Sequence, residues 1–173
     1  MFSSLPLSKC AAVSLVIVIA AITDFAQIND ATAAIRAEVN LINRNAPKYK
    51  KKIRSVEGIS LEGTEAAYLS SGKDIRKITA RIYGETFRAI DELYYKGGEL
   101  IFAFQRLEHY DTHVAMDPPP KVVKVAETRV YYAKRKAIRV LEGKKYLALA
   151  SAEFIEADES IMNLSKMLIA AAQ

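Results

Sequence analysis

The apolar positions of the chain follow three successive patterns. Over residues 28–46 they recur every three or four residues, which predicts an amphipathic helix. From about 64–142 the chain is rich in Ile, Val, Tyr and Phe and is interrupted by glycines, as is typical of β-strands. The helical spacing returns after Gly143 and predicts a second helix over 146–171.

Three related segments in the middle region each predict a β-hairpin. In each of them a Tyr is followed six or seven residues later by an Ile, with a turn between the two. Gly72, Gly97 and Gly98 suit the positive φ angles of tight turns, whereas the third turn has no glycine. The segments are "AAYLSSGKDIRKI" (66–78), "ELYYKGGELIF" (92–102) and "VYYAKRKAIRV" (130–140).

Three hairpins in series predict an α+β fold with a six-strand antiparallel β-meander. The alternation of apolar and polar residues within the strands indicates one apolar sheet face, which the stripes of the two helices match. We therefore expect a twisted or partly closed sheet packed by an N-terminal and a C-terminal helix, with a closed barrel as the alternative. The expected strands are 64–70, 74–83, 86–95, 99–110, 122–132 and 137–142.

The first 26 residues have the features of a secretory signal peptide. An uncharged apolar run follows Lys9 and ends at Ile22, and small and polar residues come after it. A helix needs about 20 apolar residues to cross a bilayer, so this run is short for a permanent anchor. We expect cleavage after Ala26, no stable membrane insertion afterwards, and an exported protein, periplasmic or secreted, with a single domain over 27–173.

The net charge of +5 bears on the choice of partners. The densest basic patch lies in a predicted linker over 47–63, which is either a solvated segment or a contact for an anionic surface such as lipid headgroups or cell-wall polymers. Tyr49 is the only aromatic residue among these charges, so no nucleic-acid partner is expected. The patch consists of Lys48, Lys50, Lys51, Lys52 and Arg54.

The sequence offers little catalytic chemistry. Cys10 is the only cysteine and is removed with the signal peptide, which leaves no disulfide, thiolate nucleophile or sulfur ligand. The chain has no Gly-x-Ser-x-Gly motif, and the "SSGKD" segment at 70–74 lacks the remainder of a phosphate-binding loop. We therefore predict that the protein is not an enzyme and has no cofactor.

The stretch "HYDTHVAMDPPP" (109–120) contains both histidines of the chain. His109, Asp111 and His113 alternate and would share one face of a strand, with neighbours about 6.6 to 7 Å apart, but the two histidines would lie about 13 Å apart. A metal site at these three residues is the minority hypothesis. The preferred hypothesis is a long loop that contacts a partner, with Tyr110 beside the histidines.

Two pairs of adjacent tyrosines, Tyr94 with Tyr95 and Tyr131 with Tyr132, add to the predicted binding surface. In a strand, one member of each pair faces the core and the other faces water or a ligand. On this basis Tyr94 and Tyr131 are candidate contacts for a partner, alongside the alternative that their rings pack in the core with the hydroxyl groups at the rim.

The segments "YGETFRAIDELYYKGGELIFAFQR" (83–106) and "ETRVYYAKRKAIRVLEG" (127–143) carry a resemblance. They resemble small exported bacterial proteins of unknown function in which Tyr-Tyr-x-x-Gly-x-Leu-Ile-Phe hairpins repeat, and they are distantly similar to MORN-like hairpin proteins. The resemblance implies an exported β-hairpin domain and assigns no catalytic residue.

Three functions follow from these patterns. The first is an exported, non-enzymatic binding protein of the bacterial envelope, such as an inhibitor or accessory protein, whose partner is a protein or an anionic polymer. The second is a carrier of a small apolar ligand between sheet and helices, in a cavity lined by residues such as Phe102, Phe104 and Ile82. The third is a metal-dependent enzyme at His109, Asp111 and His113.

Overall fold

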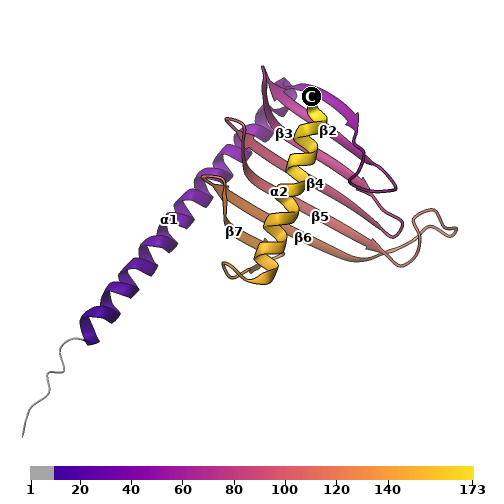
Figure 1. Ribbon diagram of the computed structural model, residues 1–173. Helices are drawn as coiled ribbons and strands as arrows, with labels where there is room; N and C mark the ends of the chain where they lie inside the picture. The colour runs from indigo at the N-terminus through magenta and orange to yellow at the C-terminus, as the bar shows by residue number, and fades with distance from the viewer. Residues whose placement is uncertain (1–9) are drawn as a thin grey trace, which may run out of the picture.

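The computed structural model describes residues 10–173, with side chains from residue 27 onward. The predicted signal peptide, 1–26, lies outside the residues described with side chains. The strands are β1 (Lys50–Ser55), β2 (Thr64–Ser71), β3 (Asp74–Tyr83), β4 (Phe87–Lys96), β5 (Glu99–Tyr110), β6 (Val122–Ala133), β7 (Lys136–Glu142) and β8 (Lys145–Tyr146). The helices are α1 (Cys10–Asn45), the short 3₁₀ helix η1 (Ala46–Lys48) and α2 (Ala152–Ala172) (Figure 1).

The α+β class and the antiparallel meander are confirmed, but the predicted count of six strands is wrong. The eight strands form one sheet in the order β1 to β8, so each strand pairs with its neighbours in sequence. β1 lies inside the segment predicted as a basic linker, 47–63, because an edge strand rich in lysine lacks the apolar alternation that marks inner strands. The sheet is open rather than partly closed, with β1 and β8 at its two edges.

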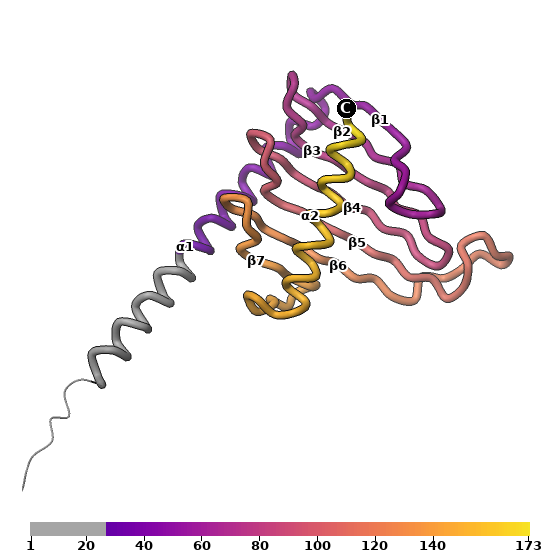
Figure 2. The backbone as a smooth tube through the Cα atoms, viewed as in Figure 1, coloured from indigo at the N-terminus to yellow at the C-terminus, as the bar shows by residue number. Residues whose placement is uncertain are grey.

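The two helices cover opposite faces of the sheet. Tyr94 packs with Ile35 and Ile42 of α1, whereas the next residue, Tyr95, packs in a second cluster with Ile161 and other residues of α2. Since successive residues of a strand point to opposite sides, these contacts define an α1 face and an α2 face. Figure 2 shows α2 running diagonally over one side of the strands, with α1 behind them.

One buried tyrosine from each hairpin packs beneath α2, and two of the three are bonded to it. The hydroxyl of Tyr68 donates a hydrogen bond to the Leu168 carbonyl at 2.9 Å, and that of Tyr95 lies 2.9 Å from Oγ of Ser165. Tyr132, the third member, is equally buried, and the nearby Asp158 carboxylate adds to burial in raising its pKa. The repeat seen in the sequence is therefore a row of anchors for the C-terminal helix.

Both ends of α2 are also fixed. Oγ of Ser151 accepts a hydrogen bond from the Phe154 N–H at the first turn, a standard N-cap. At the other end the Arg54 guanidinium donates to the Ala171 carbonyl at 2.9 Å, which places a cation at the negative end of the helix dipole. The helix begins after the two-residue strand β8, so it starts six residues later than the predicted range 146–171.

α1 crosses the other face near the hairpin turns (Figure 1). Its Glu38 carboxylate pairs with Arg76 at 2.6 Å and with Lys96 at 3.0 Å. Within the residues described with side chains, no helix combines the length and the apolar content needed to cross a membrane.

The positive φ angles predicted for the turn glycines are confirmed, and the turn of the third hairpin, which has no glycine, adopts them as well. Gly97 and Gly98 have φ angles of 57° and 79°, as the tight turn requires. Lys134 and Arg135 occupy the equivalent positions of the third hairpin with φ angles of 50° and 64°. Two L-residues thus adopt left-handed backbone in that turn, at a cost of about 1 kcal/mol or more each.

Candidate functional site

The predicted loop site is divided between a strand and a loop. His109 lies in β5 and pairs in register with Lys124 of β6. Asp111 and His113 instead organise the loop itself, since Oδ1 of Asp111 accepts from the Lys121 N–H at 2.9 Å and Nδ1 of His113 accepts from the Ala115 N–H at 3.1 Å. The side chains of Asp111 and His113 therefore have hydrogen-bond partners within the loop.

The metal hypothesis finds no support in this geometry. Among the described residues, no three or more His, Cys, Asp or Glu side chains are grouped so that they could hold a metal ion. His109, Asp111 and His113 are therefore not brought together as a triad, and only His109 lies in a strand.

Tyr94 and Tyr131, predicted as outward contacts, are covered by α1. Their exposed fractions are 2% and 4%, and both rings pack against Phe102. The Tyr94 hydroxyl donates to Glu92 at 2.6 Å, and Arg36 of α1 donates to the Tyr131 hydroxyl at 3.2 Å. With α1 in place, neither tyrosine offers a surface to a partner.

The basic patch is an edge rather than a linker. Lys50, Lys51 and Lys52 are exposed on β1, where lysines discourage pairing with the edge of another sheet. Arg54 differs from them because its guanidinium binds the end of α2. Lys48, at the end of η1, is exposed as well, so four lysines of the predicted patch are exposed and its fifth member, Arg54, has a structural role.

The cavity predicted for an apolar ligand is not formed by the residues named for it. Phe102 and Phe104 belong to the cluster beneath α1, whereas Ile82 packs in the cluster beneath α2. The full thickness of the sheet separates them, so they line no common space.

One half of the α1 face is left uncovered by the helices that the structure describes. α1 covers the end of the strands nearest the hairpin turns, and the half nearest the long β5–β6 loop is open to solvent (Figure 1). Ile90 is 42% exposed here, Tyr83 37% and Val125 46%. We call this surface the open half-face; it consists of Arg81, Tyr83, Arg88, Ile90, Arg106, Glu108, Tyr110, Val125 and Glu127.

Arg88 lies at the centre of the open half-face, between two tyrosines. Its guanidinium carbon is 6.0 Å from the centroid of the Tyr83 ring and 5.9 Å from that of Tyr110, within the range of cation–π attraction. The other arginines nearby are paired, Arg81 with Glu65 and Arg106 with Glu108. No ion pair among the described residues includes Arg88.

The long loop and the β3–β4 turn support this surface from one side. Tyr110 donates its N–H to the Thr86 carbonyl and Val114 donates to the Glu85 carbonyl, both at 2.8 Å, so the loop is bonded to the turn. Gly84 is required in that turn because a Cβ there would collide with the ring of Phe87. The predicted loop contributes to the candidate surface through Tyr110, whereas Tyr83, Arg88 and Ile90 had not been predicted.

A row of polar residues crosses the α2 face beneath the N-terminal half of α2. Strand register places Asp91, Gln105, Thr128 and Glu142 side by side on β4 to β7. The neighbouring row, which includes Leu93 and other core residues, is apolar. This second site lies on the opposite side of the sheet from the open half-face and was not predicted from the sequence.

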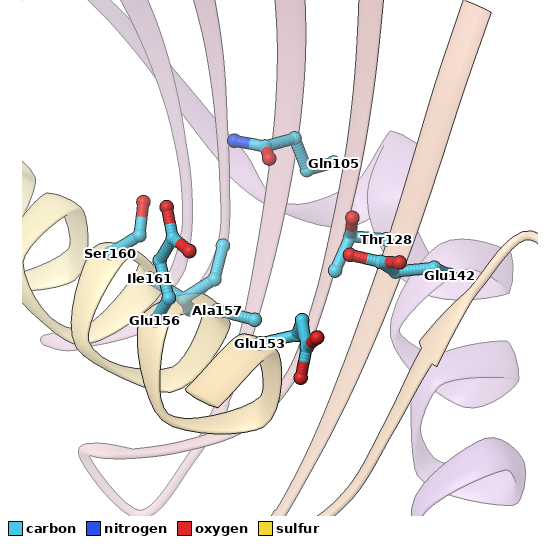
Figure 3. Close-up of a pocket in the computed structure, with 8 residues that line it drawn as sticks. All are labelled: Gln105, Thr128, Glu142, Glu153, Glu156, Ala157, Ser160 and Ile161. Atoms are coloured by element: carbon cyan, nitrogen blue, oxygen red, sulfur yellow. The ribbon is translucent and has the colours of Figure 1, made fainter. Parts of the chain in front are cut away.

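The polar row opens into a pocket of about 210 Å³ under the first turns of α2. Figure 3 shows Thr128 and Glu142 on the strands, with Glu153 and Glu156 on the helix across from them and Gln105 deeper in the sheet. Glu142, Glu153 and Glu156 form no ion pair with any described residue, although the chain as a whole carries more cationic than anionic side chains.

Asp91 is the buried end of the row. Its side chain has no solvent exposure, and among the described residues neither carboxylate oxygen has a hydrogen bond of ordinary geometry. Burial raises the pKa of Asp91 to about 6, and the neighbouring Gln105 amide acts in the opposite direction. An unpartnered carboxyl in the middle of a sheet is costly, and such groups concentrate at functional sites.

Comparisons of the chain with protein-family models, with curated proteins and with solved structures give no match.

Proposed function

We propose that this chain is an exported, non-enzymatic binding protein of the bacterial envelope that binds a partner protein through the open half-face. Export rests on the N-terminal segment of the sequence. The choice of surface rests on one observation: Arg88 lies between Tyr83 and Tyr110 on an uncovered half of a sheet face and forms no ion pair with any residue whose side chain the structure describes.

The composition of this surface supports a protein partner rather than a polymer. Arginine and tyrosine are enriched among the residues that dominate binding energy at protein interfaces, and exposed Ile90 and Val125 supply apolar area beside them. Most charges of the surface already form ion pairs, Arg81 with the neighbouring Glu65 and Arg106 with Glu108 and Glu127, so a polyanion would find little net positive charge there.

Arg88 also defines the chemistry that the partner presents. A guanidinium stacked between aromatic rings keeps its N–H groups directed outward for a carboxylate, with which it can form two parallel hydrogen bonds. The partner is therefore expected to place an Asp or Glu over Arg88, surrounded by apolar side chains that cover Ile90 and Val125.

Capture from an envelope fraction tests this proposal. Wild-type protein and the exposed-turn variant Lys73→Ala should retain the same partner, whereas Arg88→Glu and Ile90→Asp should lose it while unfolding at an unchanged temperature. Replacing the partner's carboxylate with lysine should then restore binding to Arg88→Glu. Equal capture by all variants, or no capture by wild type, would overturn the proposal.

A second candidate function, the carriage of a small apolar ligand, is favoured by a different pocket. This space of about 320 Å³ lies where both helices meet the sheet, and it is lined by Ile28 of α1, Phe154 of α2 and Ile138 of β7, among others. Its volume is at the lower end for ligand pockets. Native mass spectrometry of protein from its own host should show a bound lipid-sized mass, which Phe154→Asp removes; an unliganded mass would exclude it.

A further inference from the structure

The charged side chains at the two ends of the sheet differ in sign. In an antiparallel meander every second connection lies at the same end, so the β2–β3, β4–β5 and β6–β7 turns lie together, with η1 and the start of β1 beside them (Figure 2). We call this the turn end. Its turns, the residues flanking them and the segment from η1 to the start of β1 contain two acidic residues, Asp74 and Glu99. The same segments contain seven exposed cationic residues: Lys48, Lys50, Lys73, Lys96, Lys134, Arg135 and Lys136.

The opposite end, which we call the far end, has the reverse balance. The β1–β2, β3–β4, β5–β6 and β7–β8 connections lie there, and acidic residues outnumber cationic ones in them and at their flanking positions. A surface that only keeps a protein soluble carries both signs interspersed, so this separation indicates an anionic partner at the turn end. The far end contains Glu57, Glu62, Glu85, Asp111, Asp117 and Glu142, against Lys121, Lys144 and Lys145.

The cations of the turn end are also mostly unpaired. Lys96 binds the Glu38 carboxylate at 3.0 Å, and the other six form no ion pair with any residue whose side chain the structure describes. Arginines within the strands differ in this respect, since Arg76, Arg81 and Arg106 all have carboxylate partners. The positive charge of the turn end is therefore directed to solvent rather than used within the fold.

The arrangement of the turns suits a flat surface. Neighbouring strands of a sheet lie about 4.8 Å apart, so turns that follow every second strand are spaced about 10 Å apart. The three turns project from one edge of the sheet as a row (Figure 1). Lysine side chains at these tips can reach a plane of negative charge at the same time, without a groove to enclose it.

A hollow at the turn end favours lipid over a purely polar polymer. It has a volume of about 300 Å³ and opens between α2 and the turns of the last two hairpins. Apolar side chains lie beside cationic ones in its lining, which suits a molecule with an anionic headgroup and an apolar tail. The lining includes Leu100, Met162 and Ile169, together with Arg135, Lys166 and one acidic residue, Glu99.

We infer that the turn end binds the surface of a bilayer that contains anionic lipids. The lysines of the turns lie against the lipid phosphates, and the acidic far end is directed away from the membrane. The open half-face lies near the far end, beside the long β5–β6 loop, so it stays accessible while the turn end is bound. The membrane contact uses other residues than the open half-face and does not depend on the function proposed above.

Co-sedimentation with lipid vesicles tests the inference on protein purified from its host. Wild type should bind phosphatidylcholine vesicles that contain phosphatidylglycerol, and added salt should weaken the binding. Lys134→Gln combined with Lys136→Gln should weaken it about 25-fold, because each cation near an anionic bilayer contributes about fivefold. Both side chains are exposed, so the unfolding temperature should be unchanged.

The matched control removes two lysines from the far end. Lys144→Gln combined with Lys145→Gln lowers the net charge by the same amount. Since charges at physiological ionic strength act over about 8 Å, this variant should bind as wild type does. Three results would overturn the inference: equal binding to vesicles without phosphatidylglycerol, equal loss in the two double variants, or tighter binding to soluble polyphosphate than to vesicles, which would indicate a polymer as the partner.

Discussion

The hydroxyl of Tyr68 in the first hairpin donates a hydrogen bond to the Leu168 carbonyl near the end of α2, at 2.9 Å. Tyr95 makes the corresponding contact to Ser165 one helical turn earlier, also at 2.9 Å. Tyr132 completes the row, but its hydroxyl has no hydrogen bond of ordinary geometry among the described residues. The same repeated residue is thus bonded in two hairpins and unbonded in the third.

Phenylalanine substitutions should separate these roles. Tyr68→Phe leaves a buried carbonyl without its donor and should lower the free energy of unfolding by about 1 to 2 kcal/mol. Tyr132→Phe removes a buried hydroxyl that lacks a partner, so it should be neutral or slightly stabilising. Urea denaturation of both variants measures the difference, and equal losses would contradict the assignment of the bonds.

Asp91 should make stability depend on pH. Its pKa rises from 3.8 to about 6 on folding, so the folded state retains the proton more strongly than the unfolded state does. The resulting penalty is absent below the unfolded pKa, grows as pH rises between the two values, and is complete above the folded pKa. Relative to wild type, Asp91→Asn should therefore gain up to about 3 kcal/mol between about pH 4 and pH 7.5.

Urea denaturation at several pH values checks this prediction. Glu156→Gln is the matched control, because Glu156 is exposed at the rim of the same pocket and its removal should leave the pH profile near that of wild type. A constant difference between Asp91→Asn and wild type across the range would show that Asp91 does not titrate as described.

The ion pairs of Glu38 should hold α1 on the sheet. Its side chain is 14% exposed and contacts both Arg76 and Lys96, so Glu38→Gln should cost about 1 kcal/mol and raise amide exchange along 27–45. The pair of Arg81 with Glu65 is about half exposed on both sides, and Glu65→Gln should cost less than about 0.5 kcal/mol. Hydrogen exchange read by mass spectrometry distinguishes the two, and similar exchange in both variants would contradict a specific role for Glu38.

A glycine in the turn of the third hairpin should stabilise the protein. Arg135 has a φ angle of 64°, which glycine adopts without strain, so Arg135→Gly should raise the unfolding free energy by about 0.5 to 1 kcal/mol. Gly98 has a φ angle of 79° in the equivalent turn of the second hairpin, so Gly98→Ala should lower the free energy of unfolding by about 1 kcal/mol. Thermal unfolding of both variants gives the sign of each change.

The hairpins and helices could be predicted because their signals are local. Turn glycines and the tyrosine spacing located all six predicted strands to within one residue at each end. The three-and-four spacing located α2 and the C-terminal end of α1, which begins at Cys10 rather than at residue 28. Tyr94 and Tyr131 were expected to face outward because alternation assigns one side of a strand to solvent; the packing of α1 on that side is a long-range event that alternation does not report. β1 was not predicted because its lysines were interpreted as part of a solvated linker. Lysines are also common on edge strands, where they discourage pairing with other sheets.

A signal for both candidate sites was present in β4. Ile90 occupies a position on the polar side of the strand and Asp91 occupies one on the apolar side, so two successive residues reverse the expected alternation. Ile90 lies in the open half-face, and Asp91 lies beside Gln105, which lines the pocket under α2. Local departures from a pattern that the rest of the fold obeys are where functional residues are expected.

The consecutive order of the strands also determines when each part of the chain can fold. Each strand pairs with segments adjacent in sequence, so the sheet can form hairpin by hairpin as the chain is synthesised, with little loop entropy to overcome. α2 is made last, and its contact with Arg54 joins positions 117 residues apart. Docking of the final helix is therefore the step that converts a row of local hairpins into one cooperative unit.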